Sequence, residues 1–164
     1  MIISDTLHGH FDSEVIIRFN LAWHPKLNIL IDKIKQHKNV LVDYPYKRKK
    51  PPHVNYDIND LLQLDQLEEV KYIALSNISS VDDLSLFSEL KTHIIPKIEN
   101  KAGVNNLEQI IDYISGDKII MLDVEDLYID SPESFQGLFD QTVKCCKNHN
   151  VKLFKIHGVV FTTF

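Results

Sequence analysis

Polar and charged side chains directly follow the short apolar runs of this chain. In a parallel α/β sheet, ligands bind beyond the carboxyl ends of the strands, so residues at these positions are the first candidates for chemistry. Carboxylate oxygens suit hard cations, and Lys and Arg suit the oxygens of an anionic substrate. The candidates, in chain order, are Arg18, Asn20, Asp43, Ser76, Asn77, Lys97, Glu99, Asn100, Asp123, Glu125 and Asp126.

The apolar runs are short, rich in β-branched residues and mostly continuous, which is typical of strands covered on both faces. The intervening segments place apolar residues at helical spacing. The predicted strands are 2–3, 15–19, 40–42, 72–75, 93–95, 119–122 and 153–156, and the predicted helices lie within 27–34, 61–67, 84–90, 107–114 and 135–143. Strand and helix therefore alternate along the chain.

This alternation predicts a single α/β domain over 1–164 with a parallel sheet, either doubly wound or closed as a TIM-type barrel. Seven strands favour the barrel. A complete (β/α)8 barrel is typically about 250 residues long, so a chain of 164 residues predicts an abbreviated one. Its open sheet edge would attract another chain, so we expect a second copy or a partner protein to cover it.

Composition limits the classes of partner. The formal net charge of −5 disfavours nucleic acid and anionic lipid, and no apolar run approaches the roughly 20 residues of a membrane-spanning helix. The first residues lack the features of a secretory signal, so we expect a cytoplasmic protein. The adjacent cysteines Cys145 and Cys146 lack the spacing of a zinc or redox motif, and both are expected to be reduced.

One segment carries the most specific motif of the chain, Lys97-Ile-Glu-Asn100 followed by Gly103-Val104 and Leu107. Together with Arg18-Phe-Asn20, Asp43 and the segments 72–84 and 120–127, it resembles the barrel domain of pyruvate kinase, of the phosphoenolpyruvate/pyruvate barrel superfamily. The resemblance runs from about residue 15 to about residue 154. We expect a barrel domain without the nucleotide-covering and C-terminal domains of that family.

The resemblance implies that Glu99 and Asp126 bind Mg²⁺ or Mn²⁺, and two carboxylates from neighbouring strand ends could converge on such a cation. It also implies that Lys97 stabilises an enolate or phosphoryl oxygen and that Arg18 holds a phosphate or carboxylate oxygen. Asn20 and Asp43 match residues that surround a monovalent cation such as K⁺ in the family. Ser76 and Asn100 complete the expected substrate-binding set.

The implied function is divalent-metal-dependent chemistry on a small phosphorylated or α-keto acid, as a lyase, an aldolase or a phosphotransferase. Ala22, Tyr44 and Val124-Glu125 depart from the family pattern, so the alternative is a catalytically inactive scaffold that acts as a binding or assembly partner.

Structural roles remain open for the same residues. Glu99 and Asp126 could be solvated or salt-bridged, and Lys97 could form an ion pair with Glu99 or Asp123. The basic run of residues 47–50 is either a solvated loop or a phosphate-binding lid.

Overall fold

The computed structural model describes residues 2–4, 15–48, 51–53 and 55–156. These residues form an α/β fold in which all the recorded strand pairings are parallel. They divide into two compact units: Met1–Ser76 with Leu86–Ile95, and Asn77–Ser85 with Pro96–Phe164. The single domain predicted over 1–164 stays a prediction.

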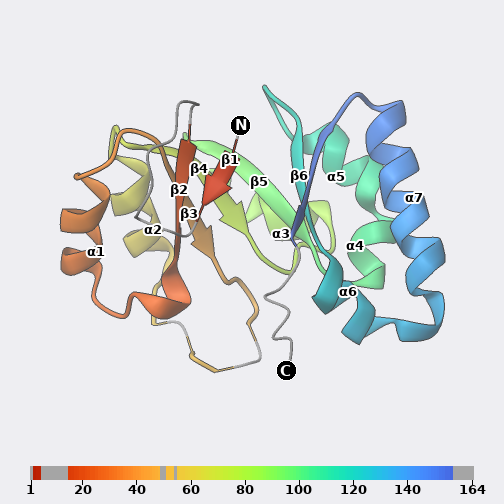
Figure 1. Ribbon diagram of the computed structural model, residues 1–164. Helices are drawn as coiled ribbons and strands as arrows, with labels where there is room; N and C mark the ends of the chain where they lie inside the picture. Colours follow the sequence, from red (N-terminus) through yellow and green to blue (C-terminus); the bar gives the residue numbers. More distant parts are fainter. Residues whose placement is uncertain (1, 5–14, 49–50, 54, 157–164) are drawn as a thin grey trace. The chain divides into compact units, whose positions relative to one another are not determined.

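The first unit is built on strands β1 to β4, which pair in the order in which they follow one another in the sequence. Helices α1 and α2 lie on the same side of β2, β3 and β4 (Figure 1). The elements are β1 (Ile2–Ser4), β2 (Val15–Asn20), the 3-10 helix η1 (Leu21–Trp23), α1 (Leu27–Ile34), β3 (Val40–Tyr44), α2 (Ile58–Asp65) and β4 (Val70–Leu75).

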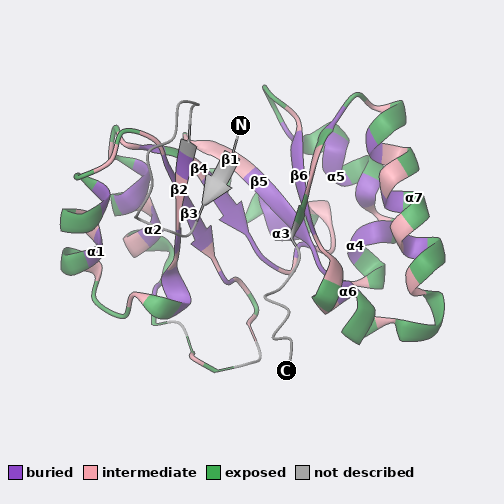
Figure 2. Ribbon diagram, in the orientation of Figure 1, coloured by how far each residue is buried: buried purple, intermediate pink, exposed green. Residues whose placement is uncertain are grey.

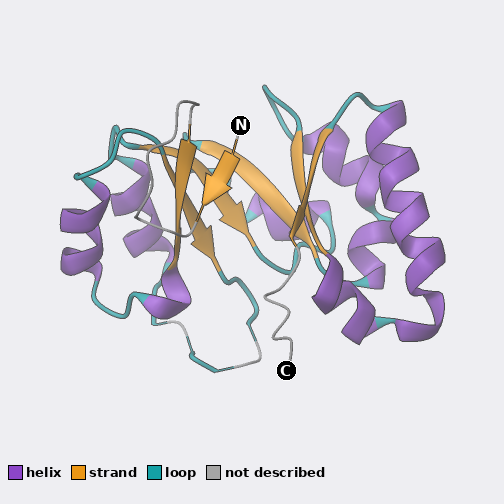
Figure 3. Ribbon diagram, viewed as in Figure 1, coloured by secondary structure: helices purple, strands orange, loops and turns teal. Residues whose placement is uncertain are grey.

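Strand β5 (His93–Ile98) belongs to the first unit up to Ile95 and to the second from Pro96 onward. In the second unit β5 pairs with β6, and β6 pairs with β7. Helices α4, α5 and α7 lie on one side of β6 and β7 (Figure 3). The other elements are α3 (Val81–Ser85), α4 (Lys101–Asn105), α5 (Leu107–Tyr113), β6 (Ile119–Asp123), α6 (Val124–Asp130), the 3-10 helix η2 (Pro132–Ser134), α7 (Phe135–Asn148) and β7 (Lys152–Ile156).

The strands form the core of each unit, as their continuous apolar sequences predict. In β3 the residues from Val40 to Asp43 are buried, and in β6 those from Ile119 to Leu122 are buried. Exposed residues gather on the outer faces of the helices (Figure 2). Burial on both faces explains why neither strand alternates between apolar and polar residues.

All seven predicted strands are present, although their bounds differ by a few residues. Helices α4 and α6 were not predicted, because α4 buries only Gly103 and Val104 and α6 buries only Leu127, too few apolar positions for a clear helical period. Closure into an abbreviated barrel stays a prediction. Lys49 and Lys50 of the basic loop lie outside the described residues, and no helix within the described ranges is long and apolar enough to cross a membrane.

Candidate metal centre

The register between β5 and β6 determines which residues meet at the ends of these strands. Ile98 pairs with Leu122. The residues that follow them, Glu99 and Asp123, therefore lie at the same level of the sheet. Both strands end there, and each is followed within a few residues by a helix, α4 after β5 and α6 after β6. Two carboxylates are thereby placed side by side at the carboxyl ends of parallel strands.

Lys97 and Glu99 are two residues apart, so their side chains leave the same face of the chain. The Lys97 Nζ atom lies 3.0 Å from Glu99 Oε1, and the two side chains are only 6% and 3% exposed. The other carboxylate oxygen, Oε2, accepts a hydrogen bond of 3.0 Å from the backbone N–H of Asn77. Glu99 is therefore held at both oxygens, and of the two ion pairs considered for Lys97 the one with Glu99 is present.

Asp123 and Asp126 are linked through the start of helix α6. Asp123 is the N-cap residue, and its Oδ1 atom accepts a hydrogen bond of 3.2 Å from the N–H of Asp126. This cap orients the first turn of the helix and so brings the half-buried Asp126 side chain back toward the strand end. One carboxylate oxygen from each of Glu99, Asp123 and Asp126 lies within 4.8 Å of the others.

A second layer of contacts fixes the backbone beside Glu99. Asn77 adopts a positive φ of 54°, which asparagine tolerates better than most residues, and this turns its N–H toward the Glu99 carboxylate. The Asn100 side chain caps α4 through Gly103 N–H at 2.8 Å and donates to Ser79 Oγ at 3.1 Å. These contacts join the turn after β4 to the turn after β5.

Gly103 explains how closely those two segments approach each other. A Cβ atom at this position would lie 2.5 Å from the carbonyl oxygen of Ile78. The same segment is held by a hydrogen bond from Ile78 N–H to the carbonyl of Lys97 at 3.2 Å. A side chain at residue 103 would therefore displace the backbone next to Lys97 and Asn77.

Three other predicted site residues, Arg18, Asn20 and Asp43, lie together in the first unit. Asp43 is fully buried and accepts hydrogen bonds at Oδ2 from Arg18 Nε at 3.0 Å and from Asn20 Nδ2 at 3.4 Å. The Asn20 Oδ1 atom also accepts from the N–H of Ala22, which caps η1. Arg18, Asn20 and Asp43 thus have structural roles that account for their presence, and their predicted anion and K⁺ roles stay predictions.

The remaining predicted residues also have local roles. Ser76 is buried and its N–H donates to the carbonyl of Tyr44 at 3.1 Å, within the first unit. Asn100 is the N-cap of α4. Asp123 was among the candidates but was not assigned to the metal, and its position after a buried strand and before a short helix was the available signal.

Comparisons with known proteins show similarity in fold. No family model matches the chain, and no curated protein matches it. Among solved structures, RipC from Yersinia pestis is similar with a TM-score of 0.63 and 17% sequence identity, over 85% of this chain and 68% of RipC. At this identity the likeness concerns the fold alone.

These findings overturn the resemblance to pyruvate kinase, which is wrong. No model of that family or of the phosphoenolpyruvate/pyruvate superfamily matches, and the similar solved structure shares only a fold. The motif has a local explanation: Lys97 forms an ion pair with Glu99, Asn100 caps α4, and Gly103 permits a close backbone approach. Local folding requirements can produce such a motif without common function.

Proposed function

We propose that Glu99, Asp123 and Asp126 bind a divalent cation, Mg²⁺ or Mn²⁺, and that Lys97 acts beside it on a small α-keto or phosphorylated acid. The observation that carries the proposal is the convergence of three carboxylates within 4.8 Å next to a buried lysine. Oxygens bound to one Mg²⁺ are at most about 4.2 Å apart, because each Mg–O distance is about 2.1 Å. Small side-chain rotations would therefore complete the site.

Charge supports the same conclusion. Three carboxylates and one ammonium group have a formal charge of −2 when all are ionised, and they are concentrated at a partly buried strand end. Like charges in a poorly solvated place repel one another strongly. These carboxylates would attract a divalent cation, and carboxylate oxygens are the ligands that Mg²⁺ and Mn²⁺ prefer.

The chemistry proposed for this site is stabilisation of an enolate. A bound cation would attract the oxygens of a keto acid and the negative charge that develops on them. Lys97 would donate a hydrogen bond to a substrate oxygen, after rotating away from Glu99 Oε1. Glu99 keeps its orientation during this rotation because Asn77 N–H still holds Oε2.

A catalytically inactive binding module is the second candidate, and one observation favours it. Glu99 is already satisfied within the protein, by Lys97 at one oxygen and by Asn77 at the other. A buried carboxylate with two such partners has a structural role without any ligand. In that case the chain would act as a scaffold, and a partner or a second copy would cover the sheet edge. A cytoplasmic location is part of both proposals.

Titration with Mn²⁺, followed by water proton relaxation, tests the metal site. We expect saturable binding to the wild-type protein and a loss of at least about tenfold in affinity for Glu99→Gln, Asp123→Asn and Asp126→Asn, because each change removes one anionic ligand. Asp112→Asn removes an exposed carboxylate of the same unit and is the matched control. Absence of saturable binding, or equal loss in the control, would refute the metal site.

Enolate chemistry is tested separately by NMR. In D₂O, stabilisation of the enolate by Mg²⁺ would speed exchange of the C3 protons of 2-oxobutyrate, with solvent taking up each proton and returning a deuteron to C3. We expect exchange with the wild-type protein and Mg²⁺, and a large loss of exchange in Lys97→Met. Mn²⁺ binding without any exchange on 2-oxobutyrate or oxaloacetate would support the binding module instead.

A further inference from the structure

The net negative charge of the protein comes entirely from one of its two units. The first unit contains eleven carboxylate residues and eleven Lys or Arg, whereas the second contains twelve carboxylates and seven Lys, which accounts for the whole charge of −5. Within the second unit, residues 123–143 include six carboxylates and no Lys or Arg. Four of these carboxylates are exposed and give α6, η2 and α7 an acidic surface: Glu125, Asp130, Glu133 and Asp140.

The same surface exposes apolar side chains. Tyr128 is 55% exposed and Ile129 is 64% exposed, and the exposed Glu125 is three and four residues before them, on the same helical face. The exposed Glu133 follows on η2, which packs against α6. We call Glu125, Tyr128, Ile129 and Glu133 the α6–α7 patch.

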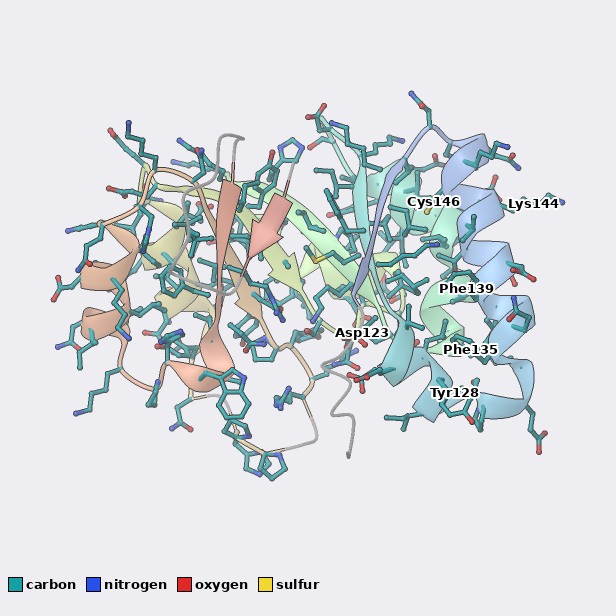
Figure 4. All side chains as sticks on the ribbon, in the orientation of Figure 1. Asp123, Tyr128, Phe135, Phe139, Lys144 and Cys146 are labelled. Atoms are coloured by element: carbon teal, nitrogen blue, oxygen red, sulfur yellow. The ribbon has the colours of Figure 1, made fainter. Side chains whose placement is uncertain are left out.

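Aromatic stacking holds the patch in place. The Tyr128 ring packs edge-on against Phe135 with ring centroids 5.5 Å apart, and Phe135 lies 6.0 Å from Phe139 (Figure 4). The Lys155 Nζ atom lies 4.8 Å from the centre of the Phe139 ring. This row of rings therefore already accommodates a lysine beside an aromatic face, an attractive arrangement in water.

The first unit carries a surface of complementary character. On α1, Ile29 is 47% exposed, and Lys26 and Lys33 lie three residues before it and four residues after it. This spacing places Ile29 and Lys33 on one face of the helix, and Lys26 is the residue just before its first turn. We call Lys26, Ile29 and Lys33 the α1 stripe. Both lysines are exposed, so the α1 stripe has an apolar centre between two positive charges, whereas the α6–α7 patch has an apolar centre between negative charges.

We propose that the α6–α7 patch docks onto the α1 stripe of a second copy of this chain. Ile29 of one copy would pack on Tyr128 and Ile129 of the other, while Lys26 and Lys33 face Glu125 and Glu133. The contact joins two different surfaces, and each copy of the chain carries both of them. The few residues involved make it a weak association that salt suppresses.

Charge reversal tests this pairing on exposed residues, whose substitution leaves the core intact. One double variant, Glu125→Lys with Glu133→Lys, makes both surfaces positive; the other, Lys26→Glu with Lys33→Glu, makes both negative. When the two variants are mixed, the positive surfaces of one can pair with the negative surfaces of the other. Each variant alone is therefore expected to be monomeric, and an equimolar mixture is expected to associate.

Sedimentation velocity is the measurement. At about 20 mM NaCl the wild type should sediment faster as its concentration rises toward about 200 μM, and about 500 mM NaCl should return it to a 19.0 kDa monomer. Lys35→Glu with Lys38→Glu changes the charge equally away from the stripe and should retain more association than Lys26→Glu with Lys33→Glu. A wild type that stays monomeric at low salt, a mixture that does not associate, or equal loss in the control overturns the proposal.

Discussion

The ammonium group of Lys97 lies 3.0 Å from Glu99 Oε1, so lysine and any bound cation would compete for the same carboxylate. Both side chains are almost fully buried, where charges interact more strongly than at the surface. The buried ion pair is thus both the structural alternative to a metal site and the part of the protein that a metal ion would have to rearrange.

Removing Lys97 should therefore tighten metal binding. In Lys97→Met the competing positive charge is gone, and we expect the Mn²⁺ dissociation constant to fall by about tenfold or more, equivalent to at least about 1.4 kcal/mol. Isothermal titration calorimetry measures this constant directly. Lys101→Met, which removes an exposed lysine of the same unit, should leave it nearly unchanged.

The direction of the change in Mn²⁺ affinity tests whether Lys97 competes with the metal ion. If Lys97→Met weakens Mn²⁺ binding, the lysine supports the site rather than competing for it, and the competition argument is wrong. Lys97→Gln, which retains a hydrogen-bond donor for Glu99 without the charge, guards against a failure of Lys97→Met to fold.

Two glycines should respond oppositely to the same change. Gly103→Ala places a Cβ atom 2.5 Å from the Ile78 carbonyl oxygen, so we expect a loss of about 1–3 kcal/mol in the free energy of unfolding. Gly137→Ala meets no atom within 4 Å and lies in helix α7, so it should gain about 0.5–1 kcal/mol from helix propensity. Urea denaturation of both variants measures the difference, and equal effects would contradict the close approach at Gly103.

Sequence patterns predicted the strands well because each is a buried apolar run, and they predicted the polar strand ends because those runs stop abruptly. Asp123 illustrates the limit. Its closeness to Glu99 depends on the pairing of Ile98 with Leu122, and a strand register is not encoded in the spacing of one segment. Likewise, Arg18 and Asp43 are 25 residues apart, and only the parallel pairing of β2 and β3 makes them an ion pair. The motif at residues 97–103 led to a wrong prediction. An ion pair, a helix cap and a close backbone approach require the same residue types as a catalytic segment.

Asp65 should be important for stability although it is far from any predicted chemistry. The residue is 8% exposed, and its carboxylate accepts hydrogen bonds from the backbone N–H groups of Lys91 at 3.0 Å and Thr92 at 2.8 Å. Asp65→Ala leaves both donors unsatisfied, and we expect a loss of about 1–3 kcal/mol in the free energy of unfolding. Thermal unfolding measures it.

Gln63→Ala, at an exposed position of the same helix, is the matched control and should change stability by less than about 0.5 kcal/mol. If Asp65→Ala leaves the free energy of unfolding unchanged, water replaces the carboxylate at these two N–H groups.

The two cysteines should differ in reactivity despite being neighbours. Burial, followed by the charge of Cys145, raises the pKa of the Cys146 thiol to about 12. Cys145 is only half-buried, and its pKa is also raised, by burial and then by Glu108 and Asp112. Since the thiolate is the reactive form, a disulfide reagent at about pH 8 should modify Cys145 first and reach Cys146 only on unfolding. Cys145→Ser should remove the early phase.

The same pKa shift predicts an alkaline loss of stability. The folded pKa of Cys146 is above the unfolded value, so its neutral thiol stabilises the fold fully below about pH 9, and this contribution declines as the pH rises toward 12. Cys146→Ala should therefore show a shallower decline in the free energy of unfolding between these pH values than the wild type. An identical slope in both proteins would mean that Cys146 ionises as readily in the folded chain as in the unfolded one, contrary to its burial on the inner face of helix α7.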